Sequence, residues 1–320
     1  MSDENRPPGG TQGPVLVTGA NGQLGRRLIE RFARDGVATR AVVRSDAAAA
    51  TLAKLPLEVA PEIVVLNYSD TARLIEAARG CEYAVHLVGI LKEGARSRYS
   101  EAHQASSRSL AAAADAANMR RTVYLSILGT DPNSDNPCLA SKGQAEQILL
   151  DASTPVLILR VAMVLGPGDS TARIVRGEAL ARILPLAGGG RTRTQPIFAD
   201  DLIDAIVAGT VGNPGSSDLD NLTLDLAGPV SLPQREFIER AAALHDKKPR
   251  IVSVPLGMFR GIAGLMERIM NDPPFTRAAL DVINEDDDID PTPACDRLGI
   301  KLTPLPEILR RCVGPEAPVE

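Results

Sequence analysis

Apolar and polar positions along the first half of the chain fall into blocks that predict strands followed by helices. Short runs rich in β-branched residues occur at 15–17, 38–43, 63–66, 83–88, 122–126 and 156–164. Most of them precede a segment whose apolar residues recur at helical spacing, as at 46–55, 99–118 and 137–150. Strands that alternate with helices in this way indicate a parallel, doubly wound sheet with right-handed crossovers. A ligand of such a sheet lies at the carboxyl ends of the strands.

The pattern loosens after Gly166, where we expect a smaller, mostly helical lobe that returns partly to the sheet. Helices are predicted to begin at 199 and at 234, and a late strand is predicted at 222–226. Apolar residues from Met258 to Ile269 fall on one side of a further helix. We interpret this stripe as a core-covering face, the alternative being a surface that docks on a membrane, a partner or an apolar ligand. The acidic run 284–290 reads as a solvated loop, because it lacks the pattern of a calcium-binding loop.

The segment VLVTGANGQLG at 15–25 is the strongest local signal in the chain. A buried-type strand meets glycines at Gly19, Gly22 and Gly25 and then an amphipathic helix. Glycine suits such a turn for backbone torsions, for close approach to a diphosphate and for packing of the helix on the strand. Free N–H groups at the helix start favour a bound anion. We therefore predict a nucleotide site, contacted by Thr18, Gly19, Asn21, Gly22, Gln23, Leu24 and Gly25.

Residues that end the other strands complete the predicted nucleotide site. Arg44 follows the second strand, where its planar guanidinium suits a 2′-phosphate and favours NADP(H) over NAD(H). The alternative is a solvated charge. Asn67 is either an adenine contact or a turn residue, and Leu87, Val88 and Gly89 end the fourth strand. We expect residues 1–13 to form a disordered tail, 14–168 the nucleotide-binding domain and 169–320 the second lobe, in which substrate or partner binds.

Composition excludes several classes of protein. The net charge is −5 and no basic cluster is interleaved with aromatic residues, so nucleic acid is not an expected partner. The four cysteines are scattered without metal-ligand spacing, which indicates free thiols in a reducing compartment and no metal site. His103 is interpreted as a packing residue. No signal peptide or membrane-spanning run occurs, so we expect a cytoplasmic protein with at most peripheral contact at the inner face of the membrane.

Several segments together resemble one family. They are VLVTGANGQLG, HLVGILKEG, SKGQAE, LRVAMVLGPGD, GGGRTRTQPIFADD, PPFTRAALDVI and LGIKLTPLPEILRR. The chain resembles the atypical and extended short-chain dehydrogenases/reductases, in the group that includes the nucleotide-binding accessory subunit of respiratory complex I and its bacterial relatives. The resemblance implies a Rossmann domain and bound NADP(H). It also places Val161 beside the nicotinamide, at a position where a proline is common.

Enzymes of that superfamily use a tyrosine four residues before a lysine on one helix face, together with a serine. By this resemblance Ser126 and Lys142 occupy matching positions, Lys142 also holding the cofactor ribose, but the tyrosine position is Cys138. None of the chain's four tyrosines precedes a lysine at that spacing. Cys138 is either an inert small residue or a reactive thiol beside a cation.

Two functions follow from these residues. The first is a nucleotide-binding sensor, assembly factor or subunit with weak or no conventional turnover, since the glycine turn is complete and the tyrosine is missing. The second is an active NADPH-dependent reductase, epimerase or dehydratase that acts on a small carbonyl, sugar or quinone-like substrate. The sequence names neither the substrate nor a protein partner.

Overall fold

A parallel sheet organises the structure, a computed structural model that describes residues 13–95, 97–213, 216–270 and 272–318. The segment 1–12, almost all of the predicted tail, lies outside these residues. Seven strands pair in the order β11-β6-β5-β4-β1-β2-β3, and each strand is parallel to its neighbours. Their bounds are β1 Val15–Thr18, β2 Thr39–Val43, β3 Glu62–Val65, β4 Tyr83–His86, β5 Arg121–Ile127, β6 Val156–Val161 and β11 Leu222–Leu226. The strand order reverses between β1 and β4, which defines the crevice of a doubly wound sheet.

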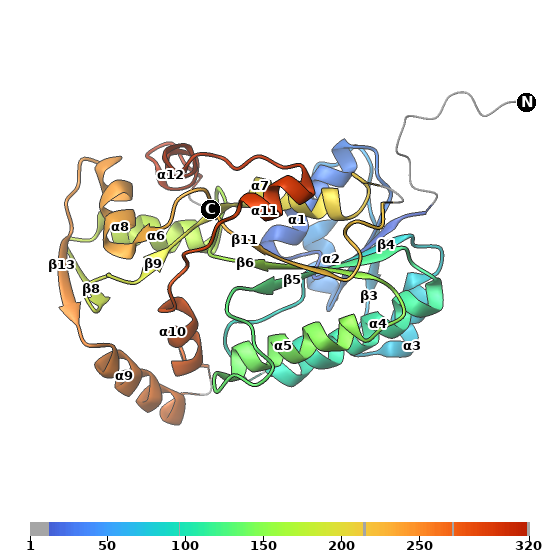
Figure 1. Ribbon diagram of the computed structural model, residues 1–320, viewed down its shortest axis with the longest axis horizontal. Coiled ribbons are helices and arrows are strands. Elements are labelled where there is room, and N and C mark those ends of the chain that lie inside the picture. The colour runs from blue at the N-terminus through green and yellow to red at the C-terminus, as the bar shows by residue number, and fades with distance from the viewer. Residues whose placement is uncertain (1–12, 96, 214–215, 271, 319–320) are drawn as a thin grey trace, which may run out of the picture.

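Helices cover both faces of the sheet (Figure 1). One face carries α1 Gln23–Arg34, α2 Asp46–Leu52, α7 Ala199–Gly209 and α11 Thr292–Leu298, whose apolar side chains share one core with the strands. The other face carries α3 Thr71–Ala78, α4 Ser106–Ala117 and α5 Pro137–Leu150. The predicted α/β, Rossmann-like fold with a smaller second lobe is confirmed.

Local capping explains where several of these helices begin and end. The Asp70 carboxylate accepts a hydrogen bond from the Arg73 amide (3.1 Å) at the start of α3. The Asn136 side chain accepts from the Cys138 amide (2.9 Å) ahead of the proline that opens α5. The helix predicted at 99–118 is regular only from residue 106, because its first turn is the π-helix η1 Ser100–Ala105.

The second lobe packs around its own apolar core. It contains α6 Ser170–Leu180, α8 Gln234–Ala243 and α12 Leu305–Val313, with the short pairs β7 Val164–Leu165 with β10 Ile197–Phe198, β8 Ile183–Ala187 with β13 Arg250–Val254, and β9 Arg193–Thr194 with β12 Leu232–Pro233. The predicted single strand at 156–164 is therefore two strands, β6 and β7. No helix of the described residues is long and apolar enough to cross a membrane.

One expectation for this lobe is wrong. The stripe on α9 Leu256–Ile269 does not cover a core, since Met258, Ile262 and Ile269 are exposed and Ala263 is the one buried residue of that helix. The acidic run forms a largely exposed loop, as the sequence predicts, and part of its backbone is bonded to the second lobe. The Asp287 amide donates to the Arg193 carbonyl (3.1 Å), and the Gln195 amide side chain bonds both backbone groups of Ile289.

Candidate nucleotide and substrate site

The turn between β1 and α1 has almost no space for side chains. Gly19 adopts a φ of +76°, and a Cβ there would lie 3.1 Å from the carbonyl carbon of Leu87. A Cβ on Gly25 would lie 2.4 Å from the Gly19 oxygen, so glycine is required where α1 packs on the turn. At Gly22 a Cβ would meet only the Gly19 oxygen, at 3.2 Å. Of the three glycines, Gly22 is therefore the one at which a side chain would point into open space.

The first turn of α1 suits a bound anion. Its N-cap is Gly22, which offers no side-chain hydrogen bond, and the first turn contains no acidic residue. The amide groups and the helix dipole there are consequently available to a phosphate group. Asn21, Gln23 and Leu24 surround this helix start and are partly exposed. These features fit the diphosphate of a dinucleotide.

Thr18 does not face this site. It is fully buried, and its hydroxyl lies 2.6 Å from Nδ1 of His86. The Ser106 hydroxyl donates to the Ala102 carbonyl (2.7 Å), so it accepts from His86 Nε2 and leaves Nδ1 to accept from Thr18. Thr18 therefore joins β1 to β4 and α4 beneath the turn.

The end of β2 presents a cation to solvent. Arg44 is exposed, and the described residues contain no ion-pair or hydrogen-bond partner for its guanidinium. Asn67, at the end of β3, is occupied as a turn residue, because its side-chain oxygen accepts from the amide (3.2 Å) and hydroxyl (3.1 Å) of Ser69. Of Arg44 and Asn67, the two nucleotide contacts predicted at these strand ends, only Arg44 has side-chain N–H groups without a partner among the described residues.

Lys142 lies buried under the loop that follows β4. Its ammonium group donates to the Leu125 carbonyl (2.7 Å), lies 4.6 Å from the centre of the Tyr124 ring, and would be 3.1 Å from a Cβ on Gly89. Burial lowers the pKa of Lys142 to about 8. Leu87 and Val88 are half-buried in the same loop, and Val161 is buried at the end of β6.

The other residues of the expected catalytic group are closed off from solvent. Ser126 is fully buried and its hydroxyl lies 3.3 Å from that of Thr130. Cys138 is also fully buried, its thiol 3.8 Å from the Ile90 carbonyl, and burial raises the pKa of that thiol. The structure brings Cys138 and Lys142 together on α5, but it does not open a path from Ser126 to a substrate oxygen.

His103 is a packing residue of this site, as the sequence predicts. The Ile90 amide donates to Nε2 (3.1 Å), so the ring proton is on Nδ1, which faces the Ser141 hydroxyl at 2.8 Å. Ser141 in turn donates to the Cys138 carbonyl (2.9 Å). Burial, with the nearby Lys142 charge, lowers the pKa of His103 to about 3. His103 is thus held neutral.

This state of the histidines predicts how stability depends on pH. His86 and His103 both have a pKa lowered to about 3 by burial, whereas the unfolded chain binds their protons near pH 6.5. Between these values the unfolded state holds more protons, so the free energy of unfolding should fall as the pH drops, by about 1.4 kcal/mol per pH unit for each histidine. Urea unfolding of His103→Gln between pH 6 and 4 should show a slope smaller by about that amount. A slope equal to that of the parent protein would contradict this assignment.

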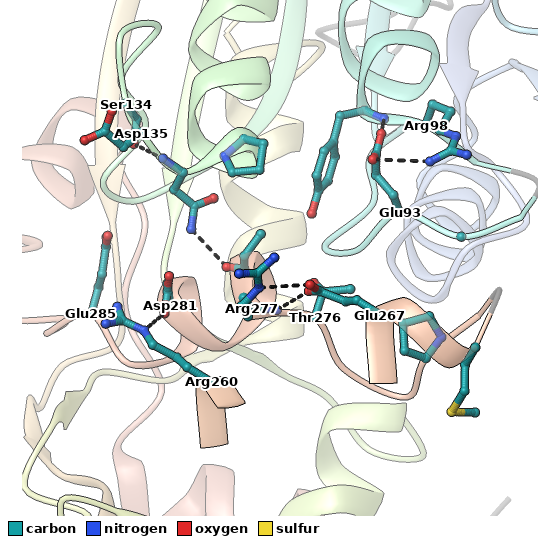
Figure 2. Close-up of a pocket in the computed structure, with 17 residues that line it drawn as sticks. Glu93, Arg98, Ser134, Asp135, Arg260, Glu267, Thr276, Arg277, Asp281 and Glu285 are labelled. Atoms are coloured by element: carbon teal, nitrogen blue, oxygen red, sulfur yellow. Dashed lines mark hydrogen bonds and ion pairs between the residues drawn. The ribbon is translucent and has the colours of Figure 1, made fainter. Parts of the chain in front are cut away.

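A cavity of about 940 Å³ opens beside the N-terminus of α5 (Figure 2). It is bounded by residues 93–94 and 98–99, by residues 134–137, and by residues of α9 and α10 Arg277–Ile283. Its arginines are paired with carboxylates, Arg260 with Asp281 at 2.7 Å and Arg277 with Glu267 at 2.9 Å. Tyr99 also lines this cavity. Spacing along the chain could not reveal Tyr99, because it precedes η1 and contacts the loop after β4 instead of lying on α5.

Together, the reversed strand order, the glycine turn and the uncapped helix define a Rossmann-fold dinucleotide-binding protein. Residues 19–182 match the NAD(P)H-binding family, and this match spans half of the chain. The chain belongs to this family.

Individual relatives agree with this assignment. The chain is 29% identical over 247 residues to a ceramide reductase of Caulobacter vibrioides, covering 76% of this chain and 74% of that one. It is 26% identical over 281 residues to the mitochondrial NADH dehydrogenase [ubiquinone] 1 alpha subcomplex subunit 9 of Arabidopsis thaliana, covering 85% and 68%. Its fold is similar to that of the Bordetella bronchiseptica enzyme WbmG in complex with NAD, with a TM-score of 0.66, 18% identity and coverage of 92% and 91%. The predicted resemblance to atypical short-chain dehydrogenases/reductases is confirmed.

Proposed function

We propose that this protein binds NADP(H) in preference to NAD(H) and works as a nucleotide-binding subunit, assembly factor or sensor with weak conventional turnover. Residues 14–168 form the nucleotide domain of this proposal and residues 169–320 the lobe that receives substrate or partner. The observation that carries the proposal is the combination of an open, uncapped α1 start with an unpaired Arg44 at the end of β2. A bound nicotinamide would supply a hydride donor or acceptor at the carboxyl edge of the sheet.

We propose limited turnover because of two residues at the expected catalytic positions. Cys138 stands where superfamily enzymes have a phenol, and both it and Ser126 are fully buried. The similarity to a subunit named for NADH dehydrogenase supports a role within an assembly, which would place the protein in the cytoplasm at the inner face of a membrane.

We expect Arg44→Ala to reduce the preference for NADPH. A guanidinium paired with the 2′-phosphate contributes about 1.5–3 kcal/mol, so the variant should bind NADPH roughly ten- to a hundredfold more weakly while NADH affinity stays the same. Calorimetric titration of both nucleotides measures this. Lys301→Ala, which removes an exposed cation from the second lobe, is the control and should leave both affinities unchanged. Equal losses for the two nucleotides would disprove phosphate recognition by Arg44.

An NADPH-dependent reductase is the second candidate function. The similarity to a ceramide reductase favours it, and so does a cavity large enough for a substrate beside α5. Mass analysis of nucleotide that co-purifies with the protein, followed by a turnover assay with carbonyl substrates, separates the two. Tightly bound NADPH that no substrate oxidises supports the first function, and brisk turnover supports the second.

A further inference from the structure

We propose that Tyr99 supplies the hydroxyl group that α5 lacks, and that it donates a proton to the oxygen of a carbonyl substrate bound in the cavity of Figure 2. This inference rests on the second candidate function, reduction of a carbonyl by NAD(P)H. It assigns the acid of that reaction to a residue that precedes η1 rather than to the helix on which the superfamily places its tyrosine.

The position of Tyr99 is fixed by three contacts. Its hydroxyl donates to the Leu91 carbonyl at 2.8 Å, next to the Ile90 carbonyl that the Cys138 thiol faces at 3.8 Å. Its ring stacks on His103 with the ring centres 5.5 Å apart. Its amide donates to the Glu93 carboxylate at 2.8 Å. The phenol is therefore held against the same loop as the thiol of Cys138.

The phenol and the thiol end at neighbouring backbone carbonyls. The Tyr99 hydroxyl donates to the Leu91 carbonyl and the Cys138 thiol donates to the Ile90 carbonyl, and Lys142 follows Cys138 by four residues on α5. A cysteine side chain is several ångströms shorter than a tyrosine. The hydroxyl of Tyr99 thus lies at the same loop as the end of the Cys138 side chain.

The other candidate donors of this cluster are unsuited to the task. His103 is fully buried, and it is not among the residues that line the cavity. Ser126 and Tyr124 are fully buried. Tyr99, although mostly buried, lines the cavity and so faces the space that a substrate would enter. Burial raises the pKa of Tyr99 above its usual range, which keeps the phenol protonated before the reaction.

The proposed step balances as a carbonyl reduction. The carbonyl carbon gains a hydride from the reduced nicotinamide, which is thereby oxidised, and the π pair of the C=O bond moves to the oxygen. The oxygen then takes the phenolic proton of Tyr99 to give an alcohol. The phenolate of Tyr99 regains a proton from water in the cavity. Tyr99 thus acts as a general acid, a contribution typically worth about 10²- to 10⁴-fold in rate.

A spectroscopic test does not require the natural substrate. The chain has four tyrosines and no tryptophan, so protein labelled with 3-fluorotyrosine should give four fluorine resonances, with that of Tyr99 identified by its loss in Tyr99→Phe. If Tyr99 faces the nicotinamide, its resonance should move more than the other three when NADP⁺ binds. It should also differ between NADP⁺ and NADPH, because only the oxidised ring carries a positive charge. Calorimetry on the same samples measures whether nucleotide is bound.

The outcomes separate this inference from the proposed function. Bound nucleotide with an unmoved Tyr99 resonance overturns the role of Tyr99 and leaves nucleotide binding intact. Absence of binding refutes both. Where a panel of carbonyl compounds gives turnover, Tyr99→Phe should lower kcat by about 10²- to 10⁴-fold while NADPH affinity stays within about twofold. Tyr83→Phe is the matched control. Tyr83 begins β4, at the end of the strand opposite to the loop that holds Tyr99, so this variant should retain the kcat of the parent protein. Equal kcat for Tyr99→Phe and the parent would overturn the inference.

Discussion

Gly22→Val is expected to abolish nucleotide binding in a chain that still folds. A Cβ at this position meets only the Gly19 oxygen, so the turn can accept it after a small shift. The branched side chain would, however, occupy the space in which a diphosphate approaches the first amides of α1. Loss of two charge-assisted hydrogen bonds would cost about 3–6 kcal/mol, or roughly 10²- to 10⁴-fold in affinity. Calorimetric titration with NADPH and a circular dichroism spectrum together test both parts.

Two other glycines serve as comparisons for this prediction. Gly25→Ala should reduce stability as well as binding, because its Cβ would lie within 2.7 Å of three backbone atoms of Gly19 and Ala20. Gly177→Ala, in the open surface of α6, should leave binding unchanged and raise stability by about 1 kcal/mol at most. Parental NADPH affinity in Gly22→Val would show that this turn does not hold a diphosphate.

Arg121→Met should cause a large loss of stability. Arg121 is almost fully buried at the start of β5, where it pairs with Asp220 (2.7 Å) and donates to the carbonyls of Gly209 (3.1 Å) and Ser216. Removing one partner of a buried ion pair leaves the other groups unsatisfied and typically costs about 3–5 kcal/mol. Urea unfolding of the variant should show this decrease in the free energy of unfolding.

The neighbouring arginine is a matched control. Arg120 pairs with Glu82 at 2.6 Å, but its side chain is 50% exposed, so Arg120→Met should cost at most about 1 kcal/mol. Similar losses for the two variants would mean that burial of the guanidinium is not what makes Arg121 important.

The elements that could be predicted from the sequence are those with a strong local pattern. The helix Pro137–Leu150 and the strand Leu222–Leu226 have the predicted bounds, because proline and an Asn cap mark the first and the alternation of leucine with polar residues marks the second. The stripe on α9 satisfies the same helical period, yet its apolar residues are exposed. Periodicity reports which residues share a face, whereas the burial of that face depends on what packs against it.

The candidate site likewise contains parts that the sequence could predict and parts that it could not. The glycine turn and Arg44 are encoded in consecutive residues at strand ends, where the topology alone brings them together. The contacts of Cys138 with Ile90, and of Thr18 with His86, join segments that are distant along the chain. No spacing rule connects such pairs. They follow from the path of the loop after β4, which sequence patterns do not specify.

The position of β11 has a consequence for biosynthesis. This strand is made after all the others of the sheet, and it covers the outer edge of β6 with five parallel residue pairs. Until the ribosome has released residue 226, β6 exposes unpaired backbone groups along an apolar strand, which is the kind of edge that recruits other chains. Nascent or prematurely terminated products that end before Leu222 should therefore aggregate or require a chaperone, even though they contain the complete glycine turn.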